Sequence, residues 1–365
     1  MRRIPPSRYL AIFATLAVLL ITAIGTLNWR IDPLQFYRRA AYPPEFVEQA
    51  RYQNPGLARN YPYDSVIAGT SVSLGFDAAD VRHGLGWDAL NLAMSGASAH
   101  EQSLILEVAI RTGKVRHVLW DLNFEYLRGS PDWVSDYDGA FPAYFYDENP
   151  WNEIPNYLLN ADTCKATARV LLGFGHIQLY RRRTVAELSR LESAHPPGRE
   201  SVLASLERAR SAPSVFERQK EDFTVAKLEA SFEANFVRVI REHPEITFEL
   251  WYPPFSIARH AFLAEAAPEV WEQMFEWKRA VTAATAGLPN VRVHDFQGER
   301  AVIVDFNHYT DTVHFDAAIR ERIIDEISRG TARATVESLA ETEKVIREET
   351  AKFQAEGTRP RALAR

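Results

Sequence analysis

The stretch Ser65-Val66-Ile67-Ala68-Gly69-Thr70-Ser71 joins a short apolar run to a glycine turn and two hydroxyl side chains. Apolar runs of this length, bounded by turn residues, predict strands that are buried on both faces of a sheet. Ser71 then lies just beyond the carboxyl end of its strand, where ligands and catalytic groups collect in open α/β sheets. A serine at that place also commonly caps the next helix. The segment alone therefore indicates either a helix start or a nucleophile.

A second polar segment, Asp311-Thr312-Val313-His314, lies near the other end of the chain. An acid and a histidine three residues apart can share one face of a helical turn. The carboxylate can then hold one imidazole nitrogen while the other nitrogen accepts a proton from a serine. Because this chemistry activates a hydroxyl nucleophile, we predict Ser71, His314 and Asp311 as catalytic residues.

Two alternatives stay open at this point. Asp305 precedes His308 with the same spacing as the first pair, so a second acid and histidine could serve the serine. Ser73 could replace Ser71 as the nucleophile, although no glycine turn precedes it.

The rest of the chain alternates short apolar strands with amphipathic helices. The predicted strands are 65–68, 89–93, 115–122, 246–252 and 291–293, and the predicted helices are 101–111, 224–242, 269–286 and 317–328. Such alternation indicates an α/β fold with a parallel sheet covered on both faces.

The composition limits the classes of function. The chain has 365 residues, of which 46% are hydrophobic, so it can bury a large core. Its net charge of −6 provides no basic surface for nucleic acid. The single cysteine, Cys164, cannot form an internal disulfide, and no Cys pair or compact His cluster suggests a metal site.

An uncharged run from Tyr9 to Leu27 is long enough to span a bilayer as a helix, at about 28 Å. Basic residues precede the run, whereas Arg30 and Asp32 follow it and cancel, so the positive-inside rule places the N-terminus in the cytoplasm and the remainder outside. We predict a single-pass anchor in the inner (cytoplasmic) membrane, with the main domain in the periplasm or another extracytoplasmic space. The alternative is a cleaved signal peptide, with Ala23-Ile24-Gly25 as the cleavage site.

The remaining segments give the predicted domain organisation. Residues 1–30 form the cytoplasmic tip and anchor, 31–62 a juxtamembrane linker with a short helix over 44–51, and 63–330 the α/β domain. An insertion over 129–223 interrupts this domain, and 331–365 hold a solvated helix (335–353) and a disordered tail.

Several aromatic residues are candidates for binding a sugar or another substrate. Trp133, Tyr144 and Tyr146 lie in the aromatic first part of the insertion, and Trp251 ends a predicted strand at the edge of the sheet that carries the site. Packing of the insertion against its host, or a rigid turn after Trp251, would account for the same residues.

The order and spacing of four blocks resemble the SGNH (GDSL-type) hydrolase superfamily over about residues 60 to 325. Gly69-Thr70-Ser71 resembles its nucleophile block and Asp311-x-x-His314 its last block, where Phe315 and the following helix favour this pair over Asp305 and His308. Between them, 91–96 and 118–123 resemble the two middle blocks. The resemblance implies a flavodoxin-like sheet.

The middle blocks imply an oxyanion hole built from the Gly96 N–H and the Asn123 side chain. A turn glycine and a local capping side chain are the alternatives for these two residues. Thr70 stands where the family has aspartate, and Asp121 where glycine is common.

The same resemblance, extended to membrane-anchored proteins of polysaccharide O-acetylation such as those acting on alginate, implies a serine O-acyltransferase or esterase. Its substrate would be a cell-envelope or exported polysaccharide or another acylated glycan, and a multi-spanning membrane acyltransferase could be a partner. No cofactor, metal or nucleic acid is expected. The alternative from another class is a catalytically silent subunit that binds glycan or scaffolds a biosynthetic complex.

Overall fold

The structure is a computed structural model, and it describes residues 5–42, 49–136, 139–147, 149–172 and 196–357. The chain forms two compact units. Unit 1 consists of residues 1–61 and 142–184, and unit 2 of residues 62–141 and 185–365. The domain boundaries expected at residues 30, 62 and 330 stay a prediction.

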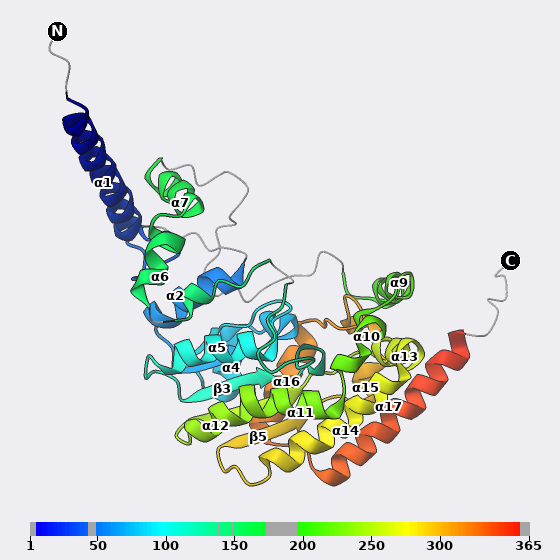
Figure 1. The fold of residues 1–365 in the computed structure, drawn as a ribbon. Helices are drawn as coiled ribbons and strands as arrows, with labels where there is room; N and C mark the ends of the chain where they lie inside the picture. Colours follow the sequence, from blue (N-terminus) through cyan, green and yellow to red (C-terminus); the bar gives the residue numbers. More distant parts are fainter. Residues whose placement is uncertain (1–4, 43–48, 137–138, 148, 173–195, 358–365) are drawn as a thin grey trace. The chain divides into compact units, whose positions relative to one another are not determined.

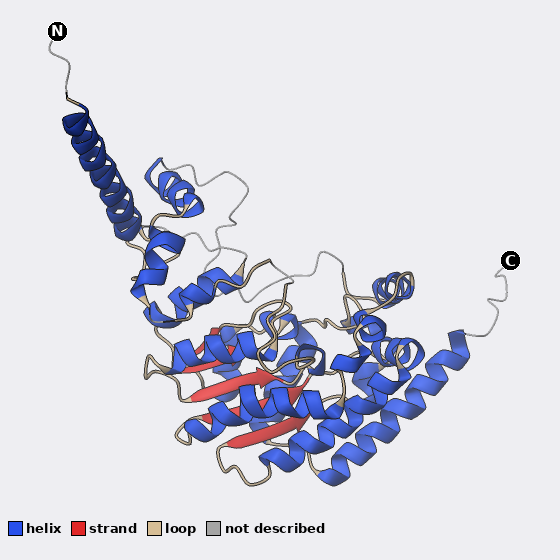
Figure 2. Cartoon of the chain, in the orientation of Figure 1, coloured by secondary structure: helices blue, strands red, loops and turns tan. Residues whose placement is uncertain are grey.

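The centre of unit 2 is a five-stranded sheet in the order β2-β1-β3-β4-β5, in which every neighbouring pair is parallel (Figure 2). The strands are β1 (Ser65–Ala68), β2 (Ala89–Asn91), β3 (His117–Asp121), β4 (Thr247–Tyr252) and β5 (Val291–Asp295). This order and direction confirm the predicted α/β class with a flavodoxin-like parallel sheet. Because β1 lies between β2 and β3, the segments that follow these three strands meet at one edge.

Helices cover both faces of this sheet, as parallel strands require. On one face α5 packs near β1, and α11 packs against α5 and α14 (Figure 1); on the other, α4 packs against β2 and α16. These helices are α4 (Ala78–Leu85), α5 (Ala99–Ile110), α11 (Val225–Phe232), α14 (Pro268–Thr285) and α16 (Ala317–Arg329). All four predicted helices are present, the second as α11 followed by η5 (Glu233–Val237) and α12 (Arg238–Glu242).

The strands are short because each needs only a few apolar residues to cross the core. All four residues of β1 are buried, as are the last four of β3 and the last five of β4. Trp120 of β3 stacks on Phe236 with ring centroids 3.9 Å apart, and its indole N–H donates to Gln102 Oε1 at 2.7 Å. A buried aromatic side chain with its polar atom satisfied packs well in such a core.

The other helices in the described part of unit 2 lie beyond the sheet or in its loops. They are α3 (Ser71–Leu74), α9 (Arg199–Arg210), α10 (Val215–Arg218), α13 (Ile257–Ala266), α15 (Arg300–Ile303) and α17 (Val336–Gly357), with the short turns η1 (Phe124–Tyr126), η4 (Lys220–Asp222) and η6 (Phe306–His308).

The C-terminal helix α17 corrects one expectation. We expected a solvated helix, but α17 packs against α13 and α14 and buries Leu339 and Ile346. Its apolar residues were too widely spaced among charged ones for the sequence to indicate a buried face. The tail beyond residue 357 lies outside the described residues.

Unit 1 is helical. It contains α1 (Pro6–Ile31), α2 (Ala50–Asn60), η2 (Ala143–Phe145), α6 (Pro150–Glu153), η3 (Ile154–Leu158) and α7 (Ala161–Leu172). Most of the helix expected over 44–51 lies outside the described residues, and α2 overlaps its last two positions. Phe36, Phe145 and Tyr157 pack ring to ring in the core, with centroids 4.9 to 5.7 Å apart.

Helix α1 is, among the described residues, the one helix that is long and apolar enough to cross a membrane. Its length and composition fit either an anchor or a signal sequence.

Candidate active site

Three segments meet at the carboxyl edge of the sheet, and each carries a residue predicted for the site. Ser71 follows β1, Gly96 follows β2 and Asn123 follows β3. Two contacts tie the flanking segments to the central one: Met94 N–H donates to Gly69 O at 3.0 Å, and the Asn123 side-chain amide donates to Thr70 Oγ1 at 3.4 Å. The topology thus places both candidate oxyanion segments beside the serine.

The turn that presents Ser71 depends on a glycine. Gly69 has φ +139°, in the region that favours glycine, and a Cβ there would lie 2.0 Å from Asp121 Oδ2. A larger residue would therefore collide with a buried carboxylate. After this turn the chain enters α3 with Ser71 as its first residue, partly exposed.

The structure brings Ser71, His314 and Asp311 into one hydrogen-bonded chain. Ser71 Oγ lies 2.8 Å from His314 Nε2, and His314 Nδ1 lies 2.7 Å from Asp311 Oδ2. The carboxylate partner assigns the ring proton to Nδ1, which leaves Nε2 free to accept the serine proton. This is the arrangement of nucleophile, base and orienting acid that activates a serine.

The backbone of the 311–314 segment is a bend and not the helical turn that the spacing suggested. Asp311 Oδ1 accepts the N–H groups of Val313 and His314 at 2.7 and 2.8 Å, so one carboxylate oxygen shapes the turn while the other holds the imidazole. An aspartate that bonds the backbone two and three residues ahead is a common turn former.

The ionisation of Asp311 suits this role. Burial raises the pKa of the Asp311 carboxyl, but the hydrogen bond and charge of His314 and the two backbone N–H groups lower it further, so the net pKa lies below its usual value. The carboxylate therefore remains ionised and can stabilise an imidazolium at His314.

The loop after β4 braces the histidine segment. Ser256 donates through both its hydroxyl (2.8 Å) and its N–H (3.3 Å) to Thr312 O, and the Tyr309 hydroxyl donates to Pro254 O at 2.6 Å. These residues carried no motif in the sequence, because their role depends on the contact of two loops about 50 residues apart.

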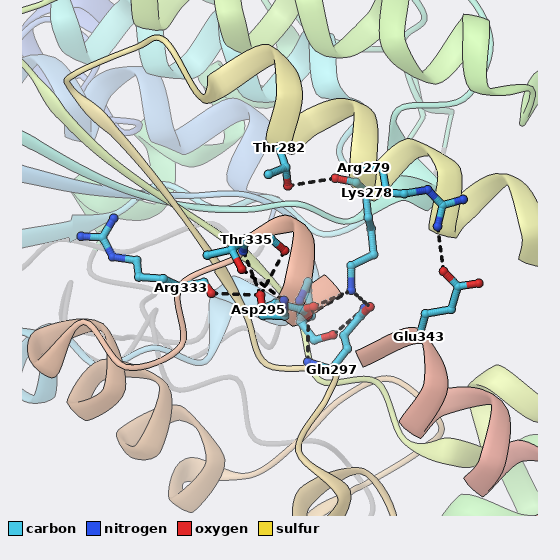
Figure 3. Close-up of polar contacts among 10 residues, drawn as sticks. Lys278, Arg279, Thr282, Asp295, Gln297, Arg333, Thr335 and Glu343 are labelled. Atoms are coloured by element: carbon cyan, nitrogen blue, oxygen red, sulfur yellow. Dashed lines mark hydrogen bonds and ion pairs between the residues drawn. The ribbon is translucent and has the colours of Figure 1, made fainter. Parts of the chain in front are cut away.

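A buried ion pair between Lys278 and Asp295 is linked to that loop through Gln297; Figure 3 shows these three side chains. The Lys278 ammonium donates to both oxygens of Asp295 at 3.0 and 2.9 Å and to Gln297 Oε1 at 2.9 Å, and Gln297 in turn donates to Pro253 O at 3.0 Å. Burial lowers the pKa of Lys278. All three ammonium protons of Lys278 are hydrogen-bonded. Through Gln297 this lysine is linked to the loop after β4, so its role is structural.

The alternative acid and histidine, Asp305 and His308, make no hydrogen bond to a serine of the described residues. His308 Nδ1 lies 2.8 Å from Asp316 Oδ2, and its Nε2 is 3.9 Å from Asp305. Ser73 is also poorly placed to act as the nucleophile, because it is fully buried and its hydroxyl donates to Asp121 Oδ2 at 2.7 Å. The geometry therefore favours the Ser71–His314–Asp311 set.

The candidate donors for an oxyanion are the Ser71 and Gly96 N–H groups and the Asn123 amide. Gly96 has φ +62°, and neither its N–H nor that of Ser71 makes a hydrogen bond within the described part of the chain. Asn123 Oδ1 accepts the Glu125 N–H at 3.3 Å, which turns the amide nitrogen toward Thr70. Free, fixed N–H groups of this kind suit a developing negative charge.

The two departures from the family pattern, Thr70 and Asp121, contact each other. Asp121 Oδ2 accepts the Thr70 N–H at 2.6 Å and the Thr70 hydroxyl at 3.2 Å. The family pattern has its aspartate within the nucleophile turn itself. Here the carboxylate that bonds this turn lies on the neighbouring strand β3. The sequence identified both departures but not their contact, because the two residues are 51 positions apart and only the sheet order brings their segments together.

The environment of Asp121 differs from that of Asp311. Full burial raises the pKa of the Asp121 carboxyl to about 6, and hydrogen bonds from Thr70 and Ser73 offset only part of this shift. Its hydrogen bonds within the described part of the chain come from neutral donors, so desolvation outweighs hydrogen bonding.

Of the four residues suggested for substrate binding, two are buried and two are half-buried. The expectation that Trp251 binds a ligand is wrong. Its side chain is 0% exposed and packs on Phe76 and Phe315, so it belongs to the core and has no surface for a ligand. Tyr146 is likewise buried, in unit 1, and its hydroxyl donates to Arg51 O at 2.7 Å.

The other two suggested residues are half-buried. Trp133 lies under the Arg128 guanidinium, 4.0 Å from its ring centroid, and Tyr144 packs on Phe145. Both stay candidates for binding a ligand.

No family model matches this chain, and no curated protein matches it either. Among solved structures, one described as a platelet activating factor from Streptococcus pneumonia is similar over 87% of this chain and 97% of its own, with 12% sequence identity and a TM-score of 0.40. At this level the likeness carries no statement about activity. Within the described ranges, no group of three or more His, Cys, Asp or Glu side chains could hold a metal ion.

Proposed function

We propose that this protein is a serine enzyme that cleaves an ester and passes the acyl group to water or to another hydroxyl. The observation that carries the proposal is the chain from Ser71 Oγ to His314 Nε2 and from His314 Nδ1 to Asp311 Oδ2, at 2.8 and 2.7 Å. Three polar groups from two distant segments meet with the distances that proton transfer from a serine requires.

In the first half of the proposed reaction, Ser71 Oγ bonds to the ester carbonyl carbon while His314 Nε2 takes its proton. The carbonyl oxygen becomes negative, and the N–H groups of Ser71 and Gly96 with the Asn123 amide are the donors that face it. The bond to the alkoxy oxygen then breaks, and His314 returns the proton to the departing alcohol.

In the second half, a water molecule or an acceptor hydroxyl attacks the acyl-serine. His314 again takes the proton of the attacking oxygen and gives it to Ser71 Oγ as the acyl–serine bond breaks. Throughout, the ionised Asp311 stabilises the positive charge of the His314 ring.

The finer proposal concerns location and substrate. We place the enzyme in the cytoplasmic membrane through α1, with its site in the extracytoplasmic space. The acceptor or substrate would be a cell-envelope or exported polysaccharide, served by a multi-spanning membrane acyltransferase. The polysaccharide and this partner rest on the resemblance of the sequence blocks alone.

The test treats the full-length protein in detergent with a serine-reactive fluorophosphonate and locates the adduct by mass spectrometry. We expect the adduct on Ser71, with none in Ser71→Ala and little in His314→Ala. The matched control is Ser73→Ala, which should keep the label on Ser71. A folded protein that acquires no adduct would support the silent glycan-binding or scaffold subunit instead.

A second assay separates the two reaction types. Turnover of an aryl acetate with and without an added oligosaccharide distinguishes hydrolysis from acyl transfer. Acetylated oligosaccharide formed in excess of free acetate identifies a transferase, and free acetate alone identifies an esterase.

A further inference from the structure

The feature that this function leaves unused is helix α7, which lies against α1 in unit 1. The two helices pack on each other, and both contact η3. Figure 1 shows α7 running back beside the C-terminal half of α1, so that its last residues point toward the side of the chain's N-terminus. A second helix therefore accompanies the candidate membrane span along part of its length.

The contact between α1 and its neighbours is specific. Asn28 of α1 is only 1% exposed, and its side-chain amide donates to Leu158 O at 2.7 Å and to Cys164 Sγ at 3.2 Å. One turn earlier, the small residue Gly25 lies beside Leu159, whose Cδ2 would be in ordinary contact, at 3.5 Å, with a Cβ at that position. A small residue and an interhelical amide bond are the devices that hold helices together in membranes.

The exposed ion pair of α7 and its two exposed leucines lie at opposite ends of the helix. Asp162 and Lys165, at the end near Asn28, are exposed and form an ion pair at 2.8 Å. At the other end, Leu171 and Leu172 are 54% and 65% exposed. An ion pair at one end and solvent-exposed leucines at the other fit a helix that starts at the membrane surface and ends within the hydrocarbon core.

The depth of these leucines follows from helix geometry. Cys164 is level with Asn28, and at 1.5 Å per residue the eight residues to Leu172 rise about 12 Å. The same rise along α1 reaches about Leu20, within an apolar stretch in which no residue is buried. The exposed end of α7 is thus level with the apolar part of α1.

We propose that α1 and α7 enter the lipid bilayer together, with α7 as a short second membrane segment that spans only part of the bilayer. The occupant of its exposed face is lipid, because this face continues the apolar surface of the membrane-spanning candidate itself. Arg169, half-buried in the last turn of α7, has a side chain long enough to reach back toward the polar end. The proposal is independent of the chemistry at Ser71.

The single cysteine makes the test direct. In a Cys164→Ser background, full-length chains carry one new cysteine each and a polarity-sensitive fluorophore, in vesicles of phosphatidylethanolamine and phosphatidylglycerol that contain nitroxide-labelled acyl chains. Leu172→Cys is the test position and Lys165→Cys its matched control, two turns earlier on the same helix. Leu16→Cys in α1 and Val336→Cys in α17 are the lipid and water references, at 60% and 69% exposed in the native chain.

We expect the fluorophore at position 172 to be quenched at least half as strongly as that at 16, and clearly more than that at 165. Quenching at 172 as weak as at 336, with strong quenching at 16, would overturn the proposal and indicate that another protein covers α7. Weak quenching at both 16 and 172 would also overturn it, because α1 itself would then lie outside the bilayer.

Discussion

Two segments of unit 2, residues 305–308 and 311–314, have the same Asp-x-x-His pattern but make different contacts. In the first, Asp305 Oδ1 bonds the backbone and side chain of Asn307, and His308 turns to Asp316. In the second, Asp311 holds both the turn and the ring of His314, which reaches Ser71. The Asp-x-x-His spacing permits an aspartate–histidine pair in both segments. The backbone after the aspartate and the position of the neighbouring loop decide whether that pair forms.

The largest expected effect compares the two histidines. His314→Ala should lower kcat/KM for an aryl acetate by about 10⁶-fold, because the general base is lost, while His308→Ala should stay within about threefold of the native enzyme. Steady-state hydrolysis by both variants measures this. Equal losses would mean that the two pairs are not distinguished by their contact with Ser71.

The two acids should differ next. Asp311→Asn keeps the size of the side chain but removes the charge that fixes the ring proton on Nδ1, so we expect kcat to fall by about 10⁴-fold. Asp305→Asn serves as the matched control and should retain nearly full activity. A large loss in the control would transfer the role of the acid to the first segment.

The next comparison uses a third carboxylate, Asp121, which is buried without a histidine partner. Its effect on stability should therefore depend on pH. Its folded pKa of about 6 lies above the usual 3.8, so its contribution to stability is fully present below about pH 4 and is lost as pH rises through about 6. Relative to Asp121→Asn, the native protein should lose up to roughly 3 kcal/mol of unfolding free energy between pH 4 and pH 8. Thermal unfolding of both proteins across this range checks the sign; a difference that is constant with pH would contradict it.

The brace on the histidine segment should have a moderate effect. Ser256→Ala removes the hydroxyl that donates to Thr312 O, and the displaced segment should lower kcat by about tenfold while KM changes little. Ser211→Ala, which removes an exposed hydroxyl bonded to Arg208 O, is the control and should leave kcat unchanged. A kcat at the native level in Ser256→Ala would show that the segment holds its place without the brace.

The smallest effect concerns the partner of His308. Asp316 accepts the Ile319 N–H as the N-cap of α16, so Asp316→Ala should cost about 1 kcal/mol of stability and leave activity within about twofold. Asp77→Ala removes the equivalent cap of α4 and should cost a similar amount in the same thermal unfolding assay. Activity loss as large as in Asp311→Asn would make His308 and Asp316 part of the site.

Much of the fold could be predicted from local patterns. The five strands and four helices appear where short apolar runs and amphipathic repeats predicted them, because burial of a parallel strand depends on only a few adjacent side chains. The burial of α17 and of Trp251 could not be predicted, since both depend on which element packs against them.

The sequence by itself determined the α/β class, the apolar first helix and the residues Ser71, Asp311 and His314 as candidates, since strand ends, hydropathy and acid–histidine spacing are local properties. Only the tertiary structure showed which of the two Asp-x-x-His segments contacts Ser71, joined Thr70 to Asp121 and placed Ser256 against the histidine segment. These contacts link segments some 50 to 240 residues apart, and their geometry is fixed by the order of the parallel strands and the packing of loops at one edge of the sheet.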